Sequence, residues 1–166
     1  MKQIKNIGIQ SLVLVLALII TGCGFQLRGA IELPPLYERV HLVDKGYSDI
    51  GRPLSEALED AGSKMVSSPK SASSVVTLLS RGTQRRALNV GGKQVREYEL
   101  QLDVAFVVQD HQGKQLSEQQ TVSLTRNFRN DPNDVLGAGN EEQIIRQEMN
   151  QSMVRQILRR LKAIAQ

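Results

Sequence analysis

The sequence predicts an α+β protein, a two-layer sandwich in which two helices cover one face of a four-stranded, mixed and mostly antiparallel sheet. Residues 98–108 alternate between apolar and polar side chains, which is typical of a strand with one buried face. Residues 53–61 and 140–164 carry apolar side chains at helical spacing. The order is strand, helix, three strands, helix, and two amphipathic helices suffice for one sheet face only.

The first half of the domain contains one strand and one helix. Residues 39–44, RVHLVD, alternate well enough to predict the first strand, and residues 45–52 form a polar loop. Pro53 suits the first turn of a helix, and Gly62 suits its end. The side chains between them that form a single apolar stripe are Leu54, Ala57, Leu58 and Ala61.

Three further strands follow. Residues 74–79 open the second strand, which runs into a basic stretch, and residues 110–113, DHQG, form the turn after the third. A fourth strand continues to about Phe128. On the third strand, we expect one face to carry Tyr98, Leu100, Leu102, Val104, Phe106 and Val108, and the other to carry Glu97, Glu99, Gln101 and Asp103.

A long helix closes the chain. We expect residues 127–140 to be a loop, Asn140 to cap the helix, and Gln143 to complete a capping box. The helix runs to about Ile164. Its predicted buried stripe consists of Ile145, Met149, Met153, Val154, Ile157, Leu158 and Leu161.

The N-terminus has the features of a secretory signal. The apolar run at residues 12–20 follows Lys2 and Lys5 and is shorter than the roughly 20 residues that a membrane-spanning helix needs. Thr21 and Gly22 then precede Cys23, the only cysteine of the chain. This order resembles a bacterial lipobox, in which Cys23 is acylated; the alternative is a plain signal peptide with an incidental cysteine.

These features predict the domain organisation. Residues 1–22 are a lipoprotein signal peptide that is removed, residues 23–36 are a lipidated N-terminus and tether, and residues 37–166 are a single domain. Within the tether, Pro34 and Pro35 disfavour a regular helix or a central strand. Two acyl chains or more on Cys23 hold a soluble body at a membrane.

Composition argues against several classes of function. Removing the signal takes Lys2 and Lys5 with it and lowers the formal charge from +4 to +2, and the chain has no Trp, so nucleic acid is not an expected partner. His41 and His111 stand far apart, and we expect no metal site, no catalytic residues and no cofactor other than the lipid. The Gly91-Gly92-Lys93 segment lacks the spacing of a phosphate loop and is read as a turn.

One stretch stands out by its charge. Residues 81–96 contain five bases and no acid, namely Arg81, Arg85, Arg86, Lys93 and Arg96, on either side of a turn at residues 89–92. The stretch is either a solvated hairpin tip or a phosphate-binding patch, since arginine offers a planar fork to phosphate oxygens. In a protein tethered to a membrane, a phosphorylated lipid is the obvious anion.

The chain resembles the LptE (RlpB) family of lipopolysaccharide (LPS) assembly lipoproteins from Gram-negative bacteria. The matching pieces are GCGFQLRG at 22–29, PLSEAL at 53–58, REYEL at 96–100, RNFRNDPNDVLG at 126–137 and EEQIIRQEMNQSMVRQILRRL at 141–161. The resemblance implies an α/β sandwich that sits inside the outer-membrane barrel protein LptD, held by its lipid at the periplasmic side of the outer membrane. It also implies LPS binding near the hairpin, for which Arg85, Arg86, Lys93 and Arg96 are the candidates.

Two other functions remain open at this point. A generic outer-membrane lipoprotein could scaffold another envelope machine, such as a barrel-folding complex, and would purify with a different barrel. A periplasmic hydrolase would need a nucleophile–base pair or perturbed acids in a pocket, and the sequence shows no such set.

Overall fold

The computed structural model describes residues 31–88, 97–129 and 135–165. They form a five-stranded sheet in the order β2-β1-β3-β4-β5. The strands are β1 (Arg39–Val43), β2 (Lys64–Met65), β3 (Ser74–Ala87), β4 (Glu97–Gln109) and β5 (Gln120–Arg129). β1 pairs in parallel with β2 and β3, whereas β3, β4 and β5 pair antiparallel.

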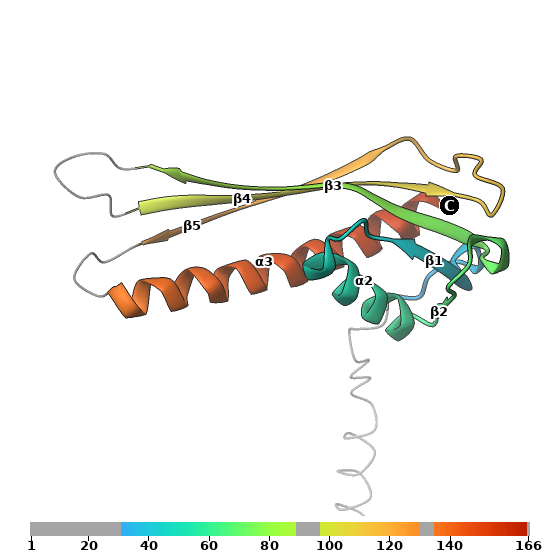
Figure 1. Cartoon of the computed structure of the whole chain (residues 1–166), viewed down its shortest axis with the longest axis horizontal. Coiled ribbons are helices and arrows are strands. Elements are labelled where there is room, and N and C mark those ends of the chain that lie inside the picture. Colours follow the sequence, from blue (N-terminus) through green and yellow to red (C-terminus); the bar gives the residue numbers. More distant parts are fainter. Residues whose placement is uncertain (1–30, 89–96, 130–134, 166) are drawn as a thin grey trace, which may run out of the picture.

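Two helices lie on the same side of this sheet, as the sequence predicted. They are α2 (Ser48–Asp60) and α3 (Val135–Ile164), and Figure 1 shows both below the strands. α3 runs along the strands for the length of the sheet, while α2, β1 and β2 gather at one end. The predicted fold class is confirmed; the fifth strand, β2, is two residues long and too short to show an alternating pattern.

The core lies between α3 and the long strands. The apolar face predicted for β4 is confirmed, since its side chains from Leu100 to Val108 at alternate positions are at most 2% exposed. β5 adds Val122 and Phe128. The helix contributes Met149, Met153, Val154, Ile157, Leu158 and Leu161, all at most 5% exposed, as its spacing predicted.

α2 begins five residues earlier than expected. The helix starts at Ser48, so Pro53 lies inside it and residues 48–52 are not loop. The reason is packing: Ile50 is fully buried and extends the apolar stripe of Leu54 and Leu58 by one turn. The predicted end is confirmed, since Gly62 has φ +91° and donates to the Glu59 carbonyl at 2.9 Å.

α3 also begins earlier than expected. It starts at Val135, so Asn140 is an exposed residue within the helix and the predicted cap and capping box at Asn140 and Gln143 are wrong. The glycines before Asn140 suggested a loop, yet extending an existing helix costs far less than starting one. The loop predicted for residues 127–140 is shorter as well, because β5 continues to Arg129.

The turn after β4 forms where the sequence places it. Asp110 Oδ1 accepts hydrogen bonds from the backbone N–H groups of Gln112 and Lys114 at 2.8 and 2.9 Å, and Gly113 has φ +86°. The hydrogen bond from the Lys114 N–H is the main reason that the pKa of Asp110 lies below its usual value. The Asp110 carboxylate and a glycine in the left-handed region therefore stabilise the turn.

Replacing Ile157 by alanine should destabilise the domain by about 2–5 kcal/mol, because this fully buried side chain leaves a cavity between α3 and the sheet. The free energy of unfolding is measured by urea denaturation. Ile144→Ala is the matched control in the same helix: Ile144 is 56% exposed, and its loss should cost about 0.5 kcal/mol or less. Equal losses for the two variants would contradict the placement of α3 on the sheet.

Candidate anion-binding site at the hairpin end

The predicted site residues fall in different places. Cys23, Lys93 and Arg96 lie outside the described residues. Arg85 and Arg86 lie near the end of β3, which is longer than expected and includes much of the basic stretch. We call the region around them, where β3 ends, β4 begins, β5 ends and α3 begins, the hairpin end; it is at the left of Figure 1.

A β-bulge decides which way the arginines of β3 face. Leu78 pairs with Phe106 of β4, and Ser80 pairs with Ala105, the residue adjacent to Phe106. Leu79 is therefore an extra residue in β3. Beyond the bulge, Arg85 is opposite Leu100, which is buried against the helices. Arg85 therefore lies on the helix side of the sheet, and its neighbour Arg86 lies on the other side.

On the helix side, Arg85 rests on two aromatic rings. Its guanidinium carbon is 3.9 Å from the centroid of the Tyr98 ring and 5.8 Å from that of Phe128. The two rings are themselves stacked, with centroids 5.5 Å apart. A guanidinium over an aromatic face is attracted by the partial negative charge of the ring face, so the two rings favour this orientation of Arg85.

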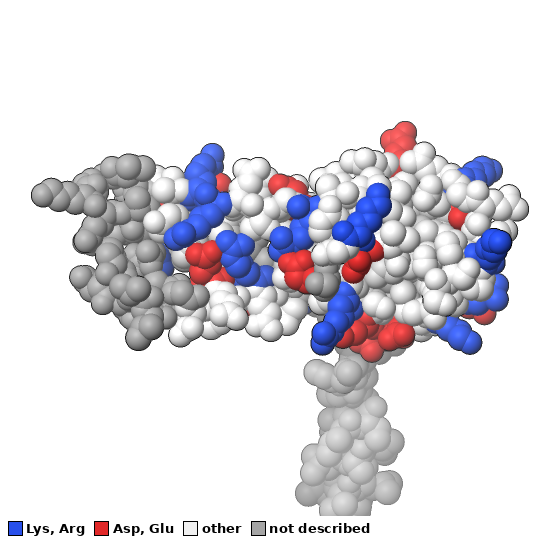
Figure 2. Space-filling view, in the orientation of Figure 1, with Lys and Arg blue, Asp and Glu red and all other residues white. Residues whose placement is uncertain are grey.

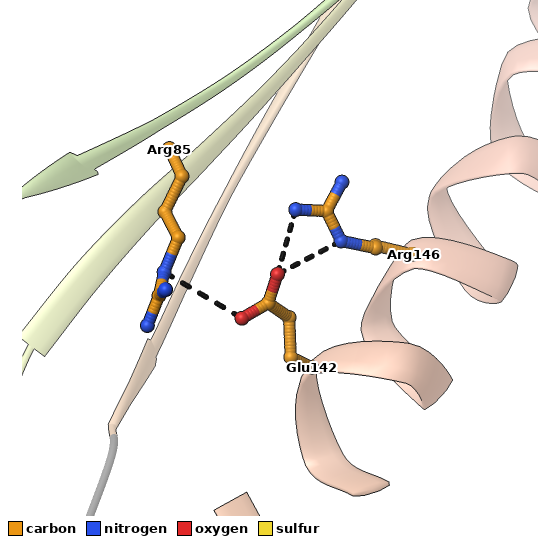
Figure 3. Close-up of polar contacts among 3 residues, drawn as sticks. All are labelled: Arg85, Glu142 and Arg146. Carbon is orange, nitrogen blue, oxygen red and sulfur yellow. Dashed lines mark hydrogen bonds and ion pairs between the residues drawn. The ribbon is translucent and has the colours of Figure 1, made fainter. Parts of the chain in front are cut away.

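A carboxylate from α3 meets this arginine. Glu142 Oε2 is 3.5 Å from Arg85 Nε, and Glu142 Oε1 accepts hydrogen bonds from Arg146 Nη2 at 2.6 Å and Nε at 2.9 Å. Figure 3 shows Glu142 between the two guanidinium groups, one from the sheet and one from the helix. The three side chains are 21% to 42% exposed, so solvent reaches all of them.

On the opposite side of the sheet, the polar face predicted for β4 is present. Arg86 Nη2 donates to Glu99 Oε1 at 2.9 Å, and Gln101 Nε2 donates to Asp103 Oδ2 at 2.9 Å. The cross-strand partners of Glu99, Gln101 and Asp103 on β5 are Asn127, Thr125 and Ser123. The face is thus polar on two neighbouring strands.

The basic stretch has acidic neighbours that its sequence does not contain. Arg81 pairs with Asp49 of α2, Arg85 with Glu142 of α3 and Arg86 with Glu99 of β4. Figure 2 shows Lys and Arg side chains lying beside Asp and Glu side chains across the middle of the molecule. The described arginines of this stretch are therefore paired, and whether they bind a phosphate remains a prediction.

Two of the residues that build this site were missed by sequence reasoning. Glu142 and Arg146 are four residues apart in a helix, a spacing that favours an ion pair and is visible in the sequence. Their contact with Arg85 depends on the bulge in β3 and on how α3 packs, and neither leaves a local signal.

Other kinds of site find no support among residues 31–88, 97–129 and 135–165. Over these ranges, no three His, Cys, Asp or Glu side chains gather in a way that could hold a metal ion. None of the helices described there is both long and apolar enough to cross a membrane.

The fold and the site define a small two-layer α+β domain in which three arginines of β3 pair with carboxylates of α2, α3 and β4. The family model "LptE: Lipopolysaccharide-assembly" matches residues 37–161 of this chain. The chain therefore belongs to the LptE family of lipopolysaccharide-assembly proteins, as the resemblance implied. No curated protein matches the sequence.

Solved structures of bacterial lipoproteins share the fold. Lipoprotein B from Nitrosomonas europaea is 28% identical, with a TM-score of 0.74 over 86% of this chain and 92% of that one. The minor lipoprotein from Acinetobacter baumannii is 25% identical, with a TM-score of 0.67 over 78% of this chain and 94% of that one. The rare lipoprotein B from Shewanella oneidensis, at 24% identity and a TM-score of 0.66 over 75% and 94%, supports the fold.

Arg85 and Tyr98 should stabilise each other by about 0.5–1 kcal/mol, because their contact is a cation over a ring face. A double-mutant cycle with Arg85→Gln and Tyr98→Leu measures this coupling from urea denaturation. Arg86→Gln with Tyr98→Leu is the control, since Arg86 lies on the other side of the sheet and should show no coupling. Equal coupling for the two arginines would contradict the register that the bulge imposes.

Proposed function

We propose that this protein is an outer-membrane lipoprotein that assembles inside an LptD-like barrel and helps to deliver LPS to the outer leaflet. The match to the LptE family over residues 37–161 carries the proposal. The likeness to lipoprotein B of Nitrosomonas europaea and to the minor lipoprotein of Acinetobacter baumannii supports the lipid anchor. The role is one of assembly and transport, and we propose no catalytic activity.

The polar face of the sheet suits a place inside a barrel. The lumen of an outer-membrane barrel is polar, so a domain with a hydrophilic surface can lie there without burying unpaired apolar groups. Glu99, Gln101 and Asp103 supply such a surface on β4, with hydroxyl and amide side chains beside them on β5. The interface with the barrel is then built from polar side chains and loops.

The lipid anchor is proposed at Cys23. The unique cysteine follows an apolar run that is too short to span a bilayer, and acyl chains on it keep the domain at the inner leaflet of the outer membrane. The tether raises the local concentration of the domain near the periplasmic mouth of the barrel.

A Cys23→Ala protein should lose its acyl chains and leave the membrane fraction. Fractionation followed by intact-mass measurement checks this. An unchanged mass together with continued membrane association would exclude lipidation at this cysteine.

Photo-crosslinkers at Gln101 and Thr125, on the polar face of the sheet, should capture the lumenal wall of a barrel. Depleting the protein should lower the amount of correctly assembled LptD-like barrel and block the arrival of LPS at the cell surface. A crosslinker at the buried Ile157 is the control and should capture no partner. Crosslinks to soluble periplasmic proteins alone would exclude the plug and favour a scaffold in another complex.

LPS should bind through the phosphates of its head group to the basic stretch at residues 81–96. The quadruple variant in which Arg85, Arg86, Lys93 and Arg96 are replaced by Gln should bind LPS more weakly than the parent, and the parent's affinity should fall as salt rises. The matched control removes four exposed cations of the C-terminal half of α3, namely Arg155, Arg159, Arg160 and Lys162, with the same change in net charge. Equal LPS affinity for the parent and the quadruple variant would contradict a phosphate-binding patch and favour a solvated hairpin tip.

A further inference from the structure

Two arginines from different elements share a single carboxylate at the hairpin end. Arg85 on β3 and Arg146 on α3 both contact Glu142, one through Nε at 3.5 Å and the other through two nitrogens at 2.6 and 2.9 Å. The cluster therefore carries two positive charges and one negative charge. Arginine is over-represented where proteins recognise phosphate through planar, two-pronged contacts.

Arg85 is already held in place for such a ligand. Its guanidinium stacks on Tyr98 and Phe128, and Glu142 meets it at Nε, at 3.5 Å. Among the residues that the structure describes, none accepts a hydrogen bond from its terminal nitrogens. A ligand that reaches Arg85 can therefore accept hydrogen bonds from terminal nitrogens that donate to no other described residue. Because the Arg85 side chain is already packed on two rings, it loses little conformational entropy when the ligand binds.

The hold on Glu142 is weak enough to be broken. Its pair with Arg146 joins residues four apart on a helix surface, an arrangement that contributes about 0.5 kcal/mol or less in other helices. Arg146 is 39% exposed and Arg85 42%, so solvent screens both contacts. Glu142 is not one of the buried residues that form the core, so its side chain can move without removing a core contact.

We propose that Arg85 and Arg146 form a binding site for a phosphate group and that Glu142 occupies this site until the ligand displaces it. The identity of the phosphate as that of an LPS head group rests on the proposed function. A phosphomonoester carries up to two charges and three terminal oxygens, so it can engage both guanidinium forks at once. Glu142 offers one charge and engages Arg85 at the longer distance.

The crevice next to Arg146 is too small for a lipid tail. A crevice beside Arg146, between β3, β4 and α3, measures about 10 Å³, which is room for a water molecule and not for an acyl chain. This crevice therefore does not take up the lipid tail of a bound amphiphile.

The other ion pairs of the basic stretch lack this geometry. Among the described residues, Arg86 pairs with one carboxylate, that of Glu99, and Arg81 with one, that of Asp49. Glu99 is a close match for Glu142, since each side chain is 21% exposed and each pairs with an arginine of β3, but on opposite sides of the sheet. This makes Glu99 the natural control.

The test compares the parent, Glu142→Gln, Glu99→Gln and Arg146→Gln, each as the full lipidated chain in detergent. The probes are LPS, the same LPS after phosphatase treatment, and inorganic pyrophosphate. Removing the competing carboxylate in Glu142→Gln should tighten binding of a phosphate-bearing probe about three- to tenfold, and Arg146→Gln should weaken it by a similar factor. Glu99→Gln should bind as the parent does, and dephosphorylated LPS should not distinguish the variants.

The outcomes distinguish a lipid head group, a free phosphate and a Glu142 that no ligand displaces. Tighter binding of intact LPS alone supports a lipid head group, and tighter binding of pyrophosphate with LPS unchanged supports a free phosphate. Parent-like or weaker binding of both phosphate probes by Glu142→Gln overturns the displacement, and so does an equal gain in Glu99→Gln. If the parent and every variant ignore LPS, the LPS-binding part of the proposed function fails, while the pyrophosphate measurement still decides whether Glu142 guards an anion site.

Discussion

One extra residue in β3 determines which surface each arginine of the hairpin end belongs to. Leu78 points into the core, so strict alternation from it would turn Arg86 toward α3 and Arg85 toward the opposite side of the sheet. Leu79 shifts the pairing by one position and reverses this assignment. Arg85 then meets Tyr98 and Glu142 on the helix side, and Arg86 meets Glu99 on the polar face. Two neighbouring residues thus serve two different surfaces.

The second constraint is the long helix that carries the other half of the site. The C-terminal part of α3 packs with Met153, Ile157 and Leu161 fully buried. Glu142 and Arg146 lie on the same helix, and Met149, one turn beyond Arg146, is 3% exposed. Because a helix is stiff over this length, packing in the core sets where these charged side chains meet β3. The position of the site therefore depends on the core, although its residues lie at the surface.

The sequence predicted those parts of the fold that repeat a local pattern. The alternation of β4 and the helical spacing of α3 each run over many residues, and the structure confirms both. The starts of the helices were wrong where Pro53 and the glycines before Asn140 suggested boundaries, because burial of Ile50 and extension of an existing helix outweighed those local preferences. The bulge at Leu79 and the acidic partners of the arginines were missed, since both depend on contacts between segments distant in sequence.

Pairing arginines with carboxylates has a consequence for selectivity. A bare cluster of exposed arginines attracts any anion, and salt weakens that attraction for all of them alike. At the proposed site an incoming anion has to replace a carboxylate that is already present, so a singly charged ligand gains little over Glu142. A phosphate gains more, because its additional charge and oxygens engage Arg85 and Arg146 together. Discrimination then arises from a competing group within the protein as much as from the contacts to the ligand. The same carboxylate keeps Arg85 and Arg146 paired when no ligand is bound.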